Sequence, residues 1–210
     1  LPRVDPALRD TTARDFATLE GGWRRALVRS GRSRVIAKVF SLGARLPAFQ
    51  QAFPDARVVY TLRDPRELLP SAMSLVTGTL DRAFGFWDRP EALKARTLER
   101  LYRALLRLLN DFAADWSAGR IDREGVLLLP YERLVGDFAG SMEAVLAFWG
   151  EGADPALQAA IDGTAAAQLR RRSEHRYDLA AFGLDEARVL ADTAPYRALW
   201  VDAGAKVPGE

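Results

Sequence analysis

Three short apolar runs along the chain have the composition of buried strands. They cover residues 34–40 (RVIAKVF), 57–62 (RVVYTL) and 125–132 (GVLLLPYE), and each is rich in β-branched or leucine side chains. Turn residues border the second run at Pro54 and Asp55. The pattern therefore predicts three buried strands.

The segments between and around these runs have the spacing of amphipathic helices. In residues 13–29, apolar side chains recur every three or four positions, although two adjacent glycines weaken the pattern. Leucines and a phenylalanine give the same period through residues 90–117. Further helices are predicted over 44–52, from Asp64 onward, and over 138–150, where Gly150 ends the last one.

The helix after the second strand has a well-defined start. Asp64 is a favourable N-cap residue, and Pro65 suits the first helical position. Glu67 stands three residues after the cap, as in a capping box.

Alternating strands and helices indicate an α/β fold. Parallel strands need a helical return across the sheet, so the order predicts a three-layer parallel sheet with flanking helices. Residues 155–210 look helical and irregular. With 210 residues and 49% hydrophobic side chains, we expect one domain over residues 1–210.

Composition narrows the possible chemistry. The net charge is only +2, from 30 basic and 28 acidic residues, so nucleic acid is not an expected partner. The chain has no cysteine and one histidine, His175. Disulfides, thiolate zinc sites and a cysteine nucleophile are excluded, and we expect no metal.

No stretch of the sequence has the apolar length of a membrane span, and the first residues lack a signal-peptide pattern. We therefore expect a soluble, cytoplasmic protein. The sequence carries no signal for a particular oligomeric state.

Arg63 and Ser71 suit the recognition of a phosphate group. In an open parallel sheet, ligands bind beyond the carboxyl ends of the strands, where Arg63 stands. Its guanidinium can hold a phosphate with two hydrogen bonds, and the Ser71 hydroxyl, aimed by a kink at Pro70, can add a neutral donor. Alternatively, Arg63 pairs with Asp64 or Glu67, and Ser71 simply packs within its helix.

The segment FPDARVVYTLRDPRELLPSAMSL (53–75) resembles the 3′-phosphate-binding segment of bacterial-type sulfotransferases. In that family a strand ends in Arg, Pro follows two residues later and Ser follows eight residues later, as at Arg63, Pro65 and Ser71. The resemblance implies a fold like that of P-loop nucleotide kinases. It also implies 3′-phosphoadenosine-5′-phosphosulfate as sulfuryl donor, with Arg63 and Ser71 at its 3′-phosphate.

Two later blocks extend the resemblance. LLLPYERLVGDFAGSMEAVLAFWG (127–150) is similar to the segment that places a tyrosine near the adenine, here Tyr131, although a packing tyrosine fits equally well. SEHRYDLAAFGLDEARVLADTAPYRALW (173–200) is similar to the family's C-terminal pattern. In the family, the loop before that pattern supplies basic groups to the 3′-phosphate of the nucleotide. In this sequence a basic run exposed to solvent is the alternative interpretation. The candidates here are Arg170, Arg171, Arg172 and Arg176.

Near its start the sequence departs from the family pattern. The Ser- or Thr-rich loop that holds the 5′-phosphosulfate is missing, since neither residues 10–12 nor 31–33 follow a strand and open a helix. We therefore expect an N-terminally truncated domain. RVIAKVFSL resembles the family's lysine-bearing loop, which makes Lys38 the candidate contact for the sulfuryl group. Phe40 stands where some members have a histidine base, so the base is unassigned.

The resemblance implies sulfuryl transfer to a hydroxyl or amine of a small-molecule or carbohydrate acceptor, without a metal. An aromatic loop near residues 74–90 is the candidate acceptor region. A nucleotide-binding or interaction domain without chemistry is the alternative. A kinase of the same fold ranks last, because the sequence lacks GxxxxGK[ST].

Overall fold

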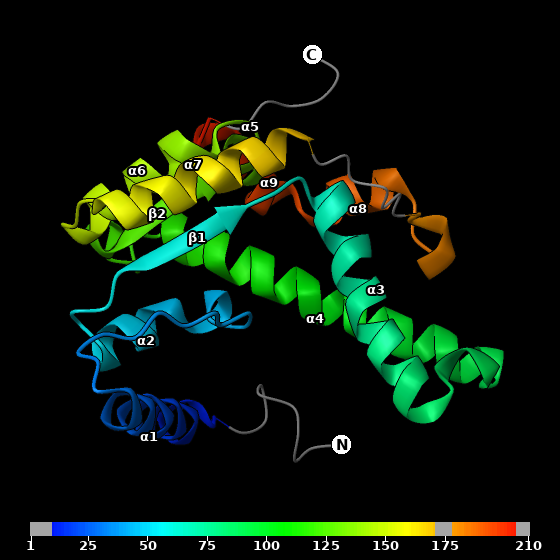
Figure 1. Ribbon diagram of the computed structural model, residues 1–210. Coiled ribbons are helices and arrows are strands. Elements are labelled where there is room, and N and C mark those ends of the chain that lie inside the picture. The colour runs from blue at the N-terminus through cyan, green and yellow to red at the C-terminus, as the bar shows by residue number, and fades with distance from the viewer. Residues whose placement is uncertain (1–9, 171–177, 205–210) are drawn as a thin grey trace.

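The computed structural model describes residues 10–170 and 178–204. Its sheet consists of two parallel strands, β1 (Val58–Leu62) and β2 (Val126–Pro130), paired in register from Val58 opposite Val126 to Leu62 opposite Pro130 (Figure 1). Two of the three predicted strands and their parallel pairing are thus confirmed, as is the α/β class.

Helices make up most of the described chain, and the predicted helices are present. In chain order they are α1 (Thr12–Ser30), α2 (Leu46–Ala52), α3 (Pro65–Phe84), α4 (Glu91–Ser117), α5 (Tyr131–Gly136), α6 (Phe138–Trp149), α7 (Pro155–Arg170), α8 (Glu186–Asp192) and α9 (Ala194–Asp202). Short 3-10 turns occur at η1 (Gly43–Arg45), η2 (Phe86–Asp88), η3 (Arg123–Gly125) and η4 (Ala180–Phe182).

The predicted strand over residues 34–40 is wrong. This segment has no regular secondary structure and pairs with neither strand, and Ile36 and Phe40 are 83% and 75% exposed. Its β-branched composition suits a strand, but a strand also has to pair with a neighbour, and neither β1 nor β2 pairs with this segment. The predicted three-layer parallel sheet is accordingly not confirmed, because the sheet of the described residues has two strands.

The crossover between the two strands consists of α3 and α4. Figure 1 shows α4 passing below the strands, whereas α6 and α7 lie above them. The Phe112 ring of α4 stacks on the Tyr60 ring of β1, with ring centroids 3.6 Å apart and an interplanar angle of 2°. The apolar face predicted for residues 90–117 therefore packs against the sheet.

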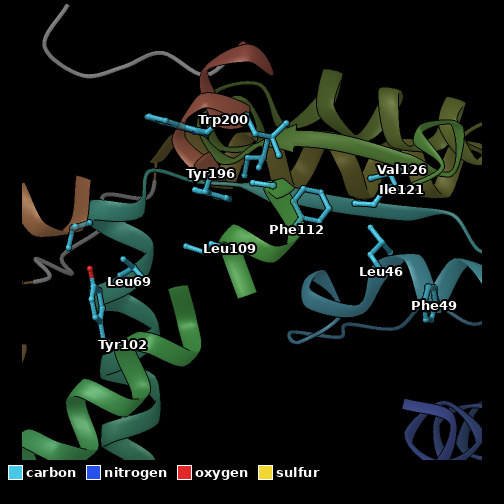
Figure 2. Packing of buried hydrophobic residues seen from close by; sticks show 14 of the residues in the cluster. Leu46, Phe49, Leu69, Tyr102, Leu109, Phe112, Ile121, Val126, Tyr196 and Trp200 are labelled. Carbon is cyan, nitrogen blue, oxygen red and sulfur yellow. The ribbon is translucent and has the colours of Figure 1, made fainter. Parts of the chain in front are cut away.

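The main core extends from the strands to the C-terminal helices. Buried side chains of α2, α3, α4 and both strands pack with those of α8 and α9 (Figure 2). Tyr102, Phe112, Tyr196 and Trp200 are among its largest fully buried members. At the N-terminal end, Phe16 of α1 meets Phe49 and Phe53 edge to face, as expected for the apolar side of the predicted amphipathic helix.

The start of α3 is as predicted in one respect and different in another. The Asp64 side chain accepts a hydrogen bond from the Arg66 backbone N–H (2.8 Å), which confirms the N-cap. Glu67 instead accepts hydrogen bonds from the Arg63 guanidinium. Beyond this first turn, α3 continues through Pro70 as one helix.

Asp64→Ala is expected to lower the free energy of unfolding by about 1–2 kcal/mol, because it removes the cap of α3. Asp64 is only 4% exposed and also pairs with the Arg66 guanidinium (2.7 Å). Asp64→Asn keeps a capping oxygen and should lose less stability. Urea unfolding of both variants checks this, and equal losses would contradict capping as the cause.

Among the helices that the structure describes, none combines the length and apolar content needed to cross a membrane.

Candidate functional site

The strand register brings Arg63 and Tyr131 together. Leu62 pairs with Pro130 at the carboxyl ends of β1 and β2, so Arg63 and Tyr131 are the next residue on each chain segment. The guanidinium carbon of Arg63 lies 4.4 Å from the centroid of the Tyr131 ring, within the range of a cation–π contact. Two residues selected separately from the sequence therefore form one site.

Arg63 is held by an ion pair but keeps donors available. Its Nε and Nη2 donate to Glu67 Oε2 at 3.2 and 2.9 Å, so the ion pair considered as an alternative does form. Among the described residues, Nη1 donates no hydrogen bond, and the side chain is 22% exposed. The guanidinium is thus oriented by Glu67 and Tyr131, and Nη1 is its one nitrogen without a hydrogen-bond partner among the described residues.

The backbone of Arg63 is fixed by Tyr196 of α9. The Tyr196 hydroxyl accepts a hydrogen bond from the Arg63 N–H (2.9 Å) and donates one to the Arg63 carbonyl (3.1 Å). Burial raises the pKa of Tyr196, which keeps the phenol neutral and able to play both roles.

A second set of contacts ties the same turn to α8. Arg66 donates to the Asp64 carboxylate and, through Nη1, to Glu186 Oε1 at 2.8 Å. Its hydrogen bonds to Asp64, followed by that to Glu186, raise the pKa of the guanidinium. The turn that carries Arg63 is therefore anchored on both sides by C-terminal helices.

Ser71 lies half-buried on α3, six residues after Pro65, or about 9 Å along the helix axis. Among the described residues, its hydroxyl has no hydrogen-bond partner, and no hydrogen bond joins it to Arg63. The hydroxyl is therefore available, but a clamp made by the two residues remains a prediction.

Lys38 is exposed on the unpaired segment before η1. Its Nζ lies 4.8 Å from the centroid of the Phe40 ring, and Arg34 of the same segment pairs with Glu151 after α6. No hydrogen bond, ion pair or ring contact in the described part of the chain joins Lys38 to Arg63, Ser71 or Tyr131.

The basic candidates near the C-terminus are only partly described. Arg170 is exposed at the last position of α7. Arg171, Arg172 and Arg176 lie outside the described residues, as does His175.

Sequence reasoning missed two residues at this site. Tyr196 lies on the buried face of α9 with Leu199 and Trp200, and a tyrosine on such an apolar face needs a hydroxyl partner, which was the available signal. Glu132 follows Tyr131 and has a buried Oε2 without a hydrogen-bond partner among the described residues. Its charge also contributes to the raised pKa of Tyr196.

The aromatic region considered for the acceptor lies at the far end of α3. Phe86 is buried, whereas Phe84 and Trp87 are exposed. Trp87 borders a groove of about 470 Å³ between the first half of α4 and residues 181–184. Because α3 has 20 residues, Phe84 at its end lies about 30 Å along the helix axis from the turn that carries Arg63. Residues 181–184, on the other side of the groove, shortly precede Glu186, which pairs with Arg66 in that turn.

Within the described ranges, no group of three or more acidic or histidine side chains is arranged to hold a metal ion.

Comparison with known proteins identifies the family. A family model described as "Sulfotransferase family" matches residues 9–155, which is more than half of the 210 residues. Searches of curated proteins and of solved structures return no significant match. The matched range includes both strands, Arg63, Ser71 and Tyr131. On this evidence the chain belongs to the sulfotransferase family.

Proposed function

We propose that this protein transfers a sulfuryl group from 3′-phosphoadenosine-5′-phosphosulfate to a hydroxyl or amine acceptor, a small molecule or a carbohydrate. Family membership supports sulfuryl transfer in general. The observation that carries the choice of donor is the Arg63 guanidinium, which lies over Tyr131 at the carboxyl ends of the strands and whose Nη1 has no hydrogen-bond partner among the described residues. A doubly charged 3′-phosphate is the natural partner for that nitrogen.

In the proposed reaction, the acceptor oxygen or nitrogen forms a bond to the sulfur of the donor. The bond from that sulfur to the 5′-phosphate oxygen breaks, and its electron pair leaves with the phosphate as adenosine 3′,5′-bisphosphate. The acceptor proton passes to a base. As in phosphoryl transfer, in-line positioning and cationic stabilisation of the leaving charge supply most of the catalysis.

The roles proposed for individual residues are those that the resemblance to the family implies. Arg63 and Ser71 bind the 3′-phosphate, with Arg170, Arg171, Arg172 and Arg176 as further candidate donors. Arg63 covers one face of the Tyr131 ring, so Tyr131 has its hydroxyl or opposite face for the adenine. Lys38 stabilises the sulfuryl oxygens.

The test is transfer of label from the sulfur-labelled donor to a panel of hydroxyl and amine acceptors, including monosaccharides. The proposal expects labelled product from at least one acceptor class, together with adenosine 3′,5′-bisphosphate in equal amount. Failure of the full-length protein to transfer label to any acceptor would contradict it.

Lys38→Ala is expected to lower kcat about a hundredfold and to leave nucleotide affinity nearly unchanged, because the ammonium stabilises charge mainly in the transition state. Lys94→Ala is the matched control: Lys94 lies on α4, bound to Glu91 at 2.5 Å, and has no described contact with Arg63, Ser71 or Tyr131. Steady-state kinetics with the labelled donor measure both variants. Equal rates for the two variants would contradict the role of Lys38.

A nucleotide-binding domain without chemistry is the second candidate function. The exposed position of Lys38, without a described contact to the Arg63 site, favours it. This alternative expects binding of adenosine 3′,5′-bisphosphate without label transfer, so the two candidates differ in turnover and not in affinity.

A further inference from the structure

The peptide of Arg63 lies between two regular elements that leave its polar groups unpaired. The β ladder ends at Leu62, opposite a proline that has no N–H. The first hydrogen bonds of α3 use the carbonyl of Asp64, which accepts from Glu67 N and Leu68 N at 3.0 and 2.9 Å. Buried backbone groups need partners, so another residue has to supply them at Arg63.

The hydroxyl of Tyr196 supplies both partners. It accepts from the Arg63 N–H and donates to the Arg63 carbonyl, so one oxygen bridges the two polar groups of a single residue. Tyr196 is fully buried, and Leu199 and Trp200 on the same face of α9 are also buried. The hydroxyl is therefore held by a packed helix.

We propose that Tyr196 is a positioning residue for recognition of the 3′-phosphate. By fixing the Arg63 peptide, it sets the direction in which the guanidinium leaves the end of β1, toward the Tyr131 ring and Glu67. This inference rests on the proposed function of Arg63. Tyr196 lies beyond residues 9–155, so this role would place part of the nucleotide site in the segment outside the family match.

Titration calorimetry on the 210-residue chain tests the proposal. Tyr196→Phe is expected to bind adenosine 3′,5′-bisphosphate about tenfold more weakly, while its weaker binding of adenosine 5′-monophosphate stays unchanged. Tyr102→Phe is the matched control. Tyr102 is also fully buried, and its hydroxyl donates to Asp192 at 2.9 Å and makes no hydrogen bond to the Arg63 peptide. This control should lose a comparable hydrogen bond without losing selectivity for the 3′-phosphate.

A double-mutant cycle separates positioning from general destabilisation. If Tyr196 acts through Arg63, Tyr196→Phe has no further effect on bisphosphate affinity in an Arg63→Ala background. Independent losses from the two changes, or equal loss of selectivity in Tyr102→Phe, would overturn the proposal.

The outcomes also separate this inference from the proposed function. If the unaltered chain does not prefer the bisphosphate, both fall. If the unaltered chain prefers the bisphosphate, and Arg63→Ala abolishes that preference whereas Tyr196→Phe retains it, only the inference about Tyr196 falls. Should Tyr196→Phe not fold, amide hydrogen exchange of the unaltered chain replaces it. We then expect the Arg63 N–H to be protected and to exchange more slowly with bisphosphate, and exchange that is unaffected by bisphosphate overturns the proposal.

Discussion

Arg63→Ala is expected to weaken binding of adenosine 3′,5′-bisphosphate about a hundredfold, because it removes charge-assisted hydrogen bonds to the 3′-phosphate. Affinity for adenosine 5′-monophosphate, which lacks that phosphate, should change little. The guanidinium is held over Tyr131 and bonded to Glu67 before ligand arrives, so little rotamer entropy is lost on binding. Titration calorimetry with both nucleotides measures the effect.

Arg57→Ala is the matched control for this prediction. Arg57 precedes β1 at the opposite end of the same strand, where it donates to the Glu124 carbonyl at 2.9 Å and lies over the Phe148 ring. The substitution Arg57→Ala removes the same charge from the chain as Arg63→Ala but leaves the carboxyl end of β1 intact. Equal losses of bisphosphate affinity in the two variants would mean that net charge, and not the site, governs binding.

Phe112→Ala is expected to lower the free energy of unfolding by about 3–5 kcal/mol. Phe112 is fully buried on α4 and stacks on Tyr60, so the change leaves a cavity between the crossover helix and β1. The Tyr60 ring loses its stacking partner, and the parallel pair of strands loses part of its support. Chemical unfolding followed by circular dichroism measures the difference.

Leu157→Ala provides the comparison for Phe112. Leu157 is a large apolar residue on α7 but is 38% exposed, so its truncation should change stability by no more than about 0.5 kcal/mol. A loss below about 1 kcal/mol for Phe112→Ala would show that the Tyr60–Phe112 stack is not central to the core.

Local sequence patterns predicted the helices and two strands well because these elements carry their own signals. Asp64 and Pro65 specify the start of α3, and Gly150, at φ 72°, ends α6 in the left-handed conformation that favours glycine. The strand predicted at residues 34–40 failed for a non-local reason. Its composition is suitable, but pairing depends on which strand edge is available, and that information is not contained in the segment itself.

Part of the candidate site was predictable because its residues, like the helices and strands, carry local sequence signals. Arg63 and Tyr131 each follow the last residue of a strand, and parallel pairing in register is sufficient to bring them together. The contribution of Tyr196 was not predictable from its own segment. It depends on how α9 packs against the end of β1, across 133 residues of sequence. The pairing of Glu67 with Arg63, by contrast, was among the alternatives considered from the sequence, and the two side chains are four residues apart.

A thermal-shift titration of the 210-residue chain tests the central claim, recognition of a 3′-phosphate, most directly. Adenosine 3′,5′-bisphosphate at a hundred times its dissociation constant should stabilise the protein by about 2.7 kcal/mol. Adenosine 5′-monophosphate at the same concentration should produce little or no shift. Equal shifts with both nucleotides, or no shift with either, would contradict the account.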